Sequence, residues 1–144
     1  MTLWRKAIFQ NPSDKAIRQF LLSIHRIAVV GLSPKPDRPS FAVAKVMQQV
    51  GMQIVPVRPF TESVLGEPAY ASLSDVPDKV DLVNVFRAAD QVDAIVDEAI
   101  ALQIPAIWIQ QGIINEAAAE RAQAAGLFVV MDRCIKIDYL RLCL

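Results

Sequence analysis

Five short runs of apolar residues, most of them rich in β-branched side chains, recur along the 144-residue chain. They lie at 26–31, 52–57, 81–86, 105–110 and 127–131. Each run is nearly continuous rather than alternating, which is typical of a strand that is buried on both faces of a sheet. The pattern therefore predicts five parallel strands.

Between these runs, apolar residues recur at helical spacing and predict helices at 13–24, 40–51, 89–103 and 115–126. Ser13, Ser40 and Asn115 stand where helix N-caps are expected. Strands that alternate with helices indicate an α/β, three-layer Rossmann-like fold, for which we expect strand order 3-2-1-4-5 in chain numbering. The ligand crevice is then expected at the carboxyl ends of the strands, beside the first strand.

The composition is that of one globular domain, 1–144, in which 1–25 form an N-terminal helical extension. Because 53% of the residues are hydrophobic and the formal net charge is zero, we expect neither disorder nor general nucleic-acid binding. No uncharged apolar run approaches the ~18 residues of a membrane span, so no membrane partner is expected. Two cysteines close together near the C-terminus do not make a disulfide scaffold, and we expect a cytoplasmic protein.

The first predicted strand runs into a stiff, basic loop, "GLSPKPDRPS". Gly31 allows a tight turn, Ser33 and Ser40 offer hydroxyl groups, and Lys35 and Arg38 add positive charge. The helix that follows directs its free N–H groups toward the crevice, which is a natural phosphate site. Only the first glycine of the dinucleotide fingerprint is present, and a solvated turn before an ordinary helix is the alternative.

The second strand ends in Arg58, where an NAD-binding domain has an acidic residue that accepts hydrogen bonds from ribose. Arginine suits a phosphorylated ribose instead, which NADP carries at the 2′ position and coenzyme A (CoA) at the 3′ position. The alternative is a surface arginine that pairs with Asp37 or Glu62.

The other strand ends add further candidates. Phe86 and Arg87 follow the third strand, where Phe86 is near enough to the crevice to touch a base. Gln110 and Gly112 follow the fourth strand. We expect Trp108, within that strand, to belong to the core.

Five stretches together carry a family resemblance: "AVVGLSPKPDRPSFAVAKVM", "IVPVRPF", "LGEPAYASLSDVP", "VDLVNVFR" and "WIQQGIINEAAAERAQAAGLFVVMDRC". In these, residues ~20–142 resemble the YccU-like family of small CoA-binding proteins, whose fold is similar to the CoA-binding domain of the succinyl-CoA synthetase alpha subunit. The resemblance implies that the first loop, through Gly31, Ser33, Arg38 and Ser40, holds the CoA diphosphate. Family members commonly have Asn where this chain has Arg58.

Little in the sequence points to catalysis. His25 lies before the first strand, opposite the crevice, and no spacing of His, Cys, Asp and Glu resembles a metal site. Cys134, beside Arg133 and Lys136, is the best reactive candidate, and a mixed disulfide with CoA is a hypothesis alongside a buried structural cysteine.

The sequence therefore predicts a non-catalytic protein that binds CoA or acyl-CoA. Two alternatives stay open, an NADP-binding redox or sensory domain and the CoA-binding subunit of an acyl-CoA synthetase-like enzyme. A structural interaction protein with an empty crevice is a third. The N-terminal apolar residues Trp4, Ile8 and Phe9 pack either on the domain itself or on a second copy or protein partner.

Overall fold

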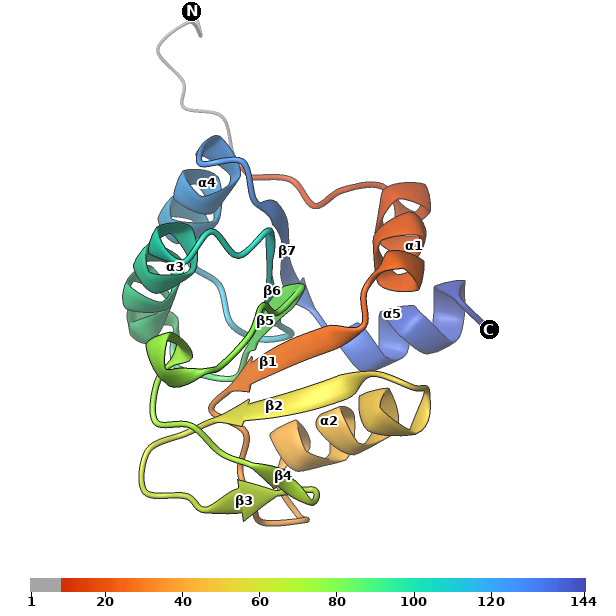
Figure 1. Cartoon of the computed structure of the whole chain (residues 1–144). Helices are drawn as coiled ribbons and strands as arrows, with labels where there is room; N and C mark the ends of the chain where they lie inside the picture. The colour runs from red at the N-terminus through yellow and green to blue at the C-terminus, as the bar shows by residue number, and fades with distance from the viewer. Residues whose placement is uncertain (1–8) are drawn as a thin grey trace, which may run out of the picture.

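The computed structural model describes residues 9–144, and its centre is a parallel sheet of five strands (Figure 1). The strands are β1 (Arg26–Val30), β2 (Gln53–Val57), β5 (Leu82–Val85), β6 (Ala106–Gln110) and β7 (Phe128–Arg133). All five lie within two residues of the runs predicted from the sequence. The predicted α/β, three-layer Rossmann-like fold is confirmed.

The predicted strand order is wrong at one place. The sheet runs β2-β1-β5-β6-β7, which is 2-1-3-4-5 for the five strands in chain order. The order 3-2-1-4-5 needs a helical crossover that lays the third strand beyond the second. The residues between β2 and β5 hold only the hairpin β3 (Ser63–Val64) and β4 (Glu67–Pro68) and the short 3₁₀ helix η1 (Leu73–Asp75). The chain instead crosses from β2 to the opposite side of β1, where β5 pairs with β1 and Leu82 lies beside Ile27.

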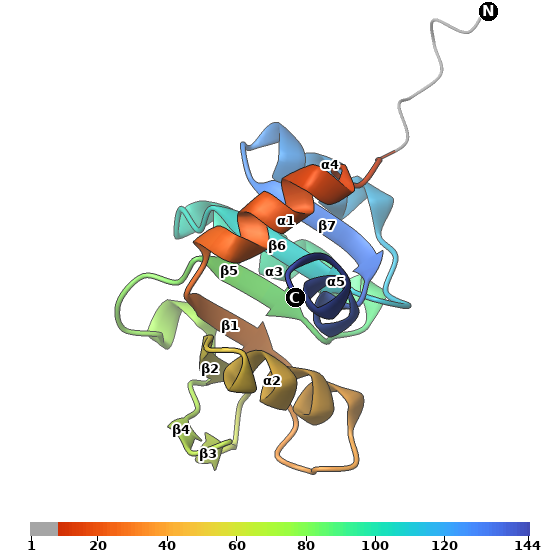
Figure 2. The same ribbon diagram turned by 90° about the vertical axis from the view of Figure 1, so that its right-hand side faces the viewer.

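Helices cover both faces of the sheet (Figures 1 and 2). On one face lie α3 (Val92–Ala101) and α4 (Glu116–Ala124), and on the other lie α1 (Asp14–Ser23), α2 (Pro39–Gln49) and α5 (Ile135–Leu142). Residues 9–144 form two hydrophobic cores, one on each face of the sheet. Alternate residues of a strand pack in different cores, because successive side chains of a strand point to opposite faces. Trp108 is fully buried on the α1–α2–α5 side, as predicted, and its Nε1 donates to the carbonyl of Arg133 at 2.8 Å.

Two of the three predicted N-caps are confirmed. Ser13 accepts a hydrogen bond from Ala16 N, and Asn115 accepts one from Ala118 N. Ser40 is not a cap: α2 begins at Pro39, and Arg38 holds the N-cap position without a side-chain hydrogen bond. Helix α3 starts later than predicted, after the 3₁₀ helix η2 (Ala89–Gln91), and α5 was not predicted.

Near the N-terminus, Phe9 is buried in the core on the α3–α4 side, which confirms self-packing for that residue. Trp4 and Ile8 lie outside the described residues. Asn11 exchanges two hydrogen bonds with the backbone of Met131 and so occupies part of the open edge of β7. None of the helices between residues 9 and 144 combines the length and the apolar character that crossing a membrane requires.

Candidate functional site

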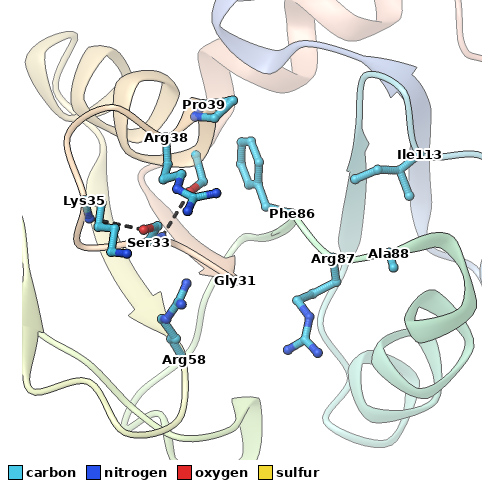
Figure 3. A pocket seen from close by; sticks show the side chains of 11 residues that line it. Gly31, Ser33, Lys35, Arg38, Pro39, Arg58, Phe86, Arg87, Ala88 and Ile113 are labelled. Atoms are coloured by element: carbon cyan, nitrogen blue, oxygen red, sulfur yellow. Dashed lines mark hydrogen bonds between the residues drawn. The ribbon is translucent and has the colours of Figure 1, made fainter.

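A cavity of about 460 Å³ opens at the carboxyl ends of β1, β2 and β5 (Figure 3). These ends meet where the winding of the sheet reverses, which is where open α/β sheets bind ligands. Eight of the eleven residues predicted for the site line the cavity: Gly31, Ser33, Lys35, Arg38, Ser40, Arg58, Phe86 and Arg87. Pro39, Ala88 and Ile113 complete the lining.

Gly31 lets the first loop approach the end of β5. Its φ of 87° lies in the left-handed region, and a Cβ at this position would lie 2.3 Å from the carbonyl oxygen of Phe86. Two backbone hydrogen bonds hold the strand ends together here, from Gly31 N to Val57 O and from Phe86 N to Val30 O, each 2.9 Å long. Only glycine allows this contact without a shift of the backbone.

The loop after Gly31 is held by its own serines. Ser33 N donates to Ser40 Oγ at 3.0 Å, and Lys35 N donates to Ser33 Oγ at 3.1 Å (Figure 3). Both serine oxygens therefore act as acceptors, and no carbonyl or carboxylate of residues 9–144 accepts from their hydroxyl groups. The loop also contains three prolines, each of which fixes a φ angle. Its shape is set before any ligand arrives, with two hydroxyl donors available to one.

Four cationic side chains surround the cavity: Lys35, Arg38, Arg58 and Arg87. Within the described part of the chain, none of the four forms a salt bridge or a side-chain hydrogen bond. The expected alternative for Arg58, a salt bridge to Asp37 or Glu62, is therefore not found there. The Ser40 N–H at the start of α2 likewise has no acceptor among residues 9–144, and the helix adds partial positive charge. This arrangement can bind a ligand with several negative charges.

The remaining wall is apolar. The ring of Phe86 stands between Arg38 and Ile113 in Figure 3, and it is half-buried. Ala88 and Ile113 were missed in the sequence because small and aliphatic side chains carry no chemical signal. Their positions directly after Arg87 and Gly112 are the only sign that could have indicated them.

The other three predicted residues, Gln110, Gly112 and Cys134, do not line this cavity. Gln110 is buried, and its Oε1 accepts from Asn84 Nδ2 at 3.2 Å and from Ile135 N at 3.4 Å. Gly112 N donates to Asp132 Oδ1 at 2.8 Å. Cys134 is buried in the core on the α1–α2–α5 side. A contact between any of the three and a longer ligand stays a prediction.

The family model for the CoA-binding domain matches residues 25–139. The chain belongs to this family. Protein YneT of Bacillus subtilis (strain 168), described as uncharacterized, is 43% identical over 130 residues, which are 90% of this chain and 96% of YneT.

Two solved structures extend the comparison. A hypothetical protein from Pyrococcus horikoshii OT3 superposes with a TM-score of 0.89 at 34% identity, over 97% of this chain and 99% of that one. A dinucleotide-forming acetyl-coenzyme A synthetase from Ca. Korarchaeum cryptofilum matches with a TM-score of 0.65 at 24% identity. That match spans 74% of this chain but 26% of the synthetase, and at this identity it shows the fold alone.

Proposed function

We propose that this protein binds CoA or acyl-CoA without catalysing a reaction, and that the cavity holds the 3′-phospho-ADP half of the ligand. Membership of the CoA-binding domain family supports the ligand class. The observation that carries the proposal is the group of four cations, Lys35, Arg38, Arg58 and Arg87, which line one cavity and have no ion-pair partner within residues 9–144.

The charges of the ligand fit this group. A diphosphate carries roughly one negative charge per phosphate, and a terminal phosphate carries about 1.5 to 2 at pH 7. The 3′-phospho-ADP half of CoA thus brings about four negative charges to four cations. A ligand with one phosphate leaves most of these cations unpaired.

The positions of the donors suggest how the ligand lies. The hydroxyl groups of Ser33 and Ser40 and the start of α2 face the diphosphate, as helix N-termini do in other phosphate sites. Arg58, at the end of β2, binds the 3′-phosphate. The pantetheine arm then leaves past Ile113 toward the ends of β6 and β7, where Gln110, Gly112 and Cys134 lie.

The cavity lining also supports a non-catalytic role. Every titratable side chain that lines it, among the described residues, is a lysine or an arginine. General acid–base catalysis near neutral pH relies mostly on histidine or carboxylates, and neither lines this cavity within residues 9–144. The rival role, as the CoA-binding subunit of a synthetase-like enzyme, requires a second protein that copurifies with this chain and CoA-dependent turnover by the pair.

Isothermal titration calorimetry with CoA, dephospho-CoA and NADP tests the proposal. We expect CoA to bind, and dephospho-CoA to bind about 10- to 100-fold more weakly, the scale of one charge-assisted hydrogen bond. Equal binding of the two would overturn the assignment of Arg58 to the 3′-phosphate. No binding of CoA would overturn the proposed function, and tighter binding of NADP would favour the redox or sensory alternative.

A further inference from the structure

One wall of the cavity depends on a single side chain. Among residues 9–144, Ile113 is the only residue of the cavity lining that follows β6, while the others follow β1, β2 or β5. Ile113 also packs against the core on the α3–α4 side, and in Figure 3 it stands across the site from Lys35. The position of this wall therefore depends on the backbone that carries Ile113.

That backbone forms a tight turn at the end of β6. Ile113 N donates to Gln110 O at 3.1 Å, and Gly112 has a φ of 87°, as glycine does at the third residue of a type II β-turn. The N–H of Gly112 is not used inside such a turn. It donates instead to Asp132 Oδ1 at 2.8 Å, and this hydrogen bond joins the turn to β7.

Asp132 reaches the turn because of an irregularity in β7. Between the pairs formed by Ile109 and Gln110, β7 has one residue more than β6, and this residue is Asp132. Its φ is 60°, in the left-handed region that residues other than glycine seldom adopt. A β-bulge turns a side chain away from its regular direction, and bulges are frequent next to functional sites. Here the redirected side chain is the one that holds the turn.

We propose that Asp132 is a positioning residue for the ligand: its hydrogen bond to Gly112 fixes the turn, the turn fixes Ile113, and Ile113 guides the pantetheine arm out of the cavity. The inference rests on the proposed function, in which the arm leaves past Ile113. Asp132 does not line the cavity, so it acts through Gly112 and Ile113 rather than by touching the phosphates. Its removal should therefore weaken the binding of CoA and leave the binding of 3′-phospho-ADP unchanged.

The first test compares these two ligands by calorimetry, since 3′-phospho-ADP is CoA without the pantetheine arm. D132G removes the carboxylate and suits the left-handed backbone. We expect it to bind CoA at least about fivefold more weakly than the wild type, the scale of one hydrogen bond, and 3′-phospho-ADP within about twofold. D132N keeps an oxygen that accepts from Gly112 N, so it should bind both ligands like the wild type. A D132G variant that loses affinity for both ligands alike, or for neither, would overturn the positioning role, and so would an equal loss of CoA affinity in D132N.

Asp78→Gly is the matched control. Asp78 is exposed and has a φ of 65°, but it precedes β5, at the edge of the sheet opposite the cavity. We expect D78G to bind both ligands like the wild type. A loss of CoA affinity in D78G as large as that in D132G would assign the effect to a more flexible backbone and contradict the inference.

A double-mutant cycle tests whether Asp132 acts through Ile113. I113A should weaken CoA binding by itself, and the double variant D132G/I113A should bind CoA about as weakly as the weaker of the two single variants. Additive losses would overturn the route through Ile113. If the wild type binds CoA and D132G binds it equally well, the positioning role fails and the proposed function still holds. If the wild type does not bind CoA, the proposed function itself fails.

Discussion

Arginine serves two purposes in this molecule. Around α5, Arg133 donates two hydrogen bonds to Asp138, at 2.9 and 2.7 Å, and Arg141 donates two to Asp14, at 2.8 and 2.9 Å. Around the cavity, Arg38, Arg58 and Arg87 have no carboxylate partner among the described residues. The chain has as many carboxylates as lysines and arginines, yet no carboxylate of residues 9–144 pairs with the cavity cations.

The difference predicts which property each arginine supports. The paired arginines join α5 to the end of β7 and to α1, so removing them should cost stability. The cavity cations repel one another, and a bound anion relieves that repulsion. Removing one of them should therefore cost ligand affinity and leave stability nearly unchanged.

The largest expected effect comes from the shape of the cavity rather than from its charge. Gly31→Ala should lower the free energy of unfolding by about 3 kcal/mol or more, because it combines a left-handed backbone with a Cβ 2.3 Å from Phe86 O. Gly112→Ala is the matched control: it has the same φ of 87°, but no atom lies within 4 Å of its Cβ position. We expect about 1 to 2 kcal/mol there, measured by urea unfolding. Equal losses in the two variants would contradict the close contact at Gly31.

The second prediction concerns the paired arginines around α5, whose shared partner is Asp138. Asp138 is 2% exposed and receives hydrogen bonds from both Arg133 and Arg141. Asp138→Asn should lower the free energy of unfolding by about 2 to 3 kcal/mol, less than for a fully buried pair because the arginines are partly solvated. Calorimetry should find CoA affinity within about threefold of the wild type. A large loss of CoA affinity with little loss of stability would contradict a structural role for Asp138.

Arg58→Met tests the cavity side. The variant keeps an apolar stem and removes the guanidinium group, so CoA affinity should fall about 10- to 100-fold. The free energy of unfolding without ligand should change by less than about 0.5 kcal/mol. Dephospho-CoA, which lacks the 3′-phosphate, is the control ligand and should bind the variant and the wild type alike. Equal losses for both ligands would place Arg58 elsewhere on the ligand.

The smallest effect concerns pH. A hydrogen bond from Asn115, followed by one from Arg121, lowers the pKa of Asp93 below its ordinary value of 3.8. This stabilisation is fully present above pH 3.8 and is lost as the pH falls through the lower value in the folded protein. Unfolding followed by circular dichroism should therefore show stability falling below pH 3.8, and less steeply in Asp93→Asn. An identical pH dependence in the two proteins would show that Asp93 does not contribute to the stability lost at low pH.

The strands of the five-stranded sheet and four of the five α-helices within residues 9–144 could be predicted, because the spacing of apolar residues reports burial directly. Strand order could not, since it depends on where the chain goes after β2, and a hairpin rather than a helix follows that strand. The role of Ser40 was misread for a similar reason. A serine where a helical pattern starts is usually a cap, but Ser40 lies inside α2 and its Oγ accepts a hydrogen bond from Ser33 N across the loop.

The cations of the cavity could also be predicted from the sequence, because the loops that follow parallel strands meet at the same edge of the sheet. The hydrogen-bond partners of Gln110 could not be predicted. Its carboxamide meets Asn84 and the backbone of Ile135, more than 20 residues away in each direction. Contacts of this kind depend on the final register of β5 and β6 and on the position of α5, which no local pattern predicts.

A crystal structure of the protein with bound CoA would show whether the cavity holds the 3′-phospho-ADP half of the ligand. We expect the diphosphate to lie within hydrogen-bonding distance of the Ser33–Ser40 loop, with the 3′-phosphate at Arg58. Well-ordered CoA bound elsewhere, with Arg38 and Arg58 facing only solvent, would contradict it.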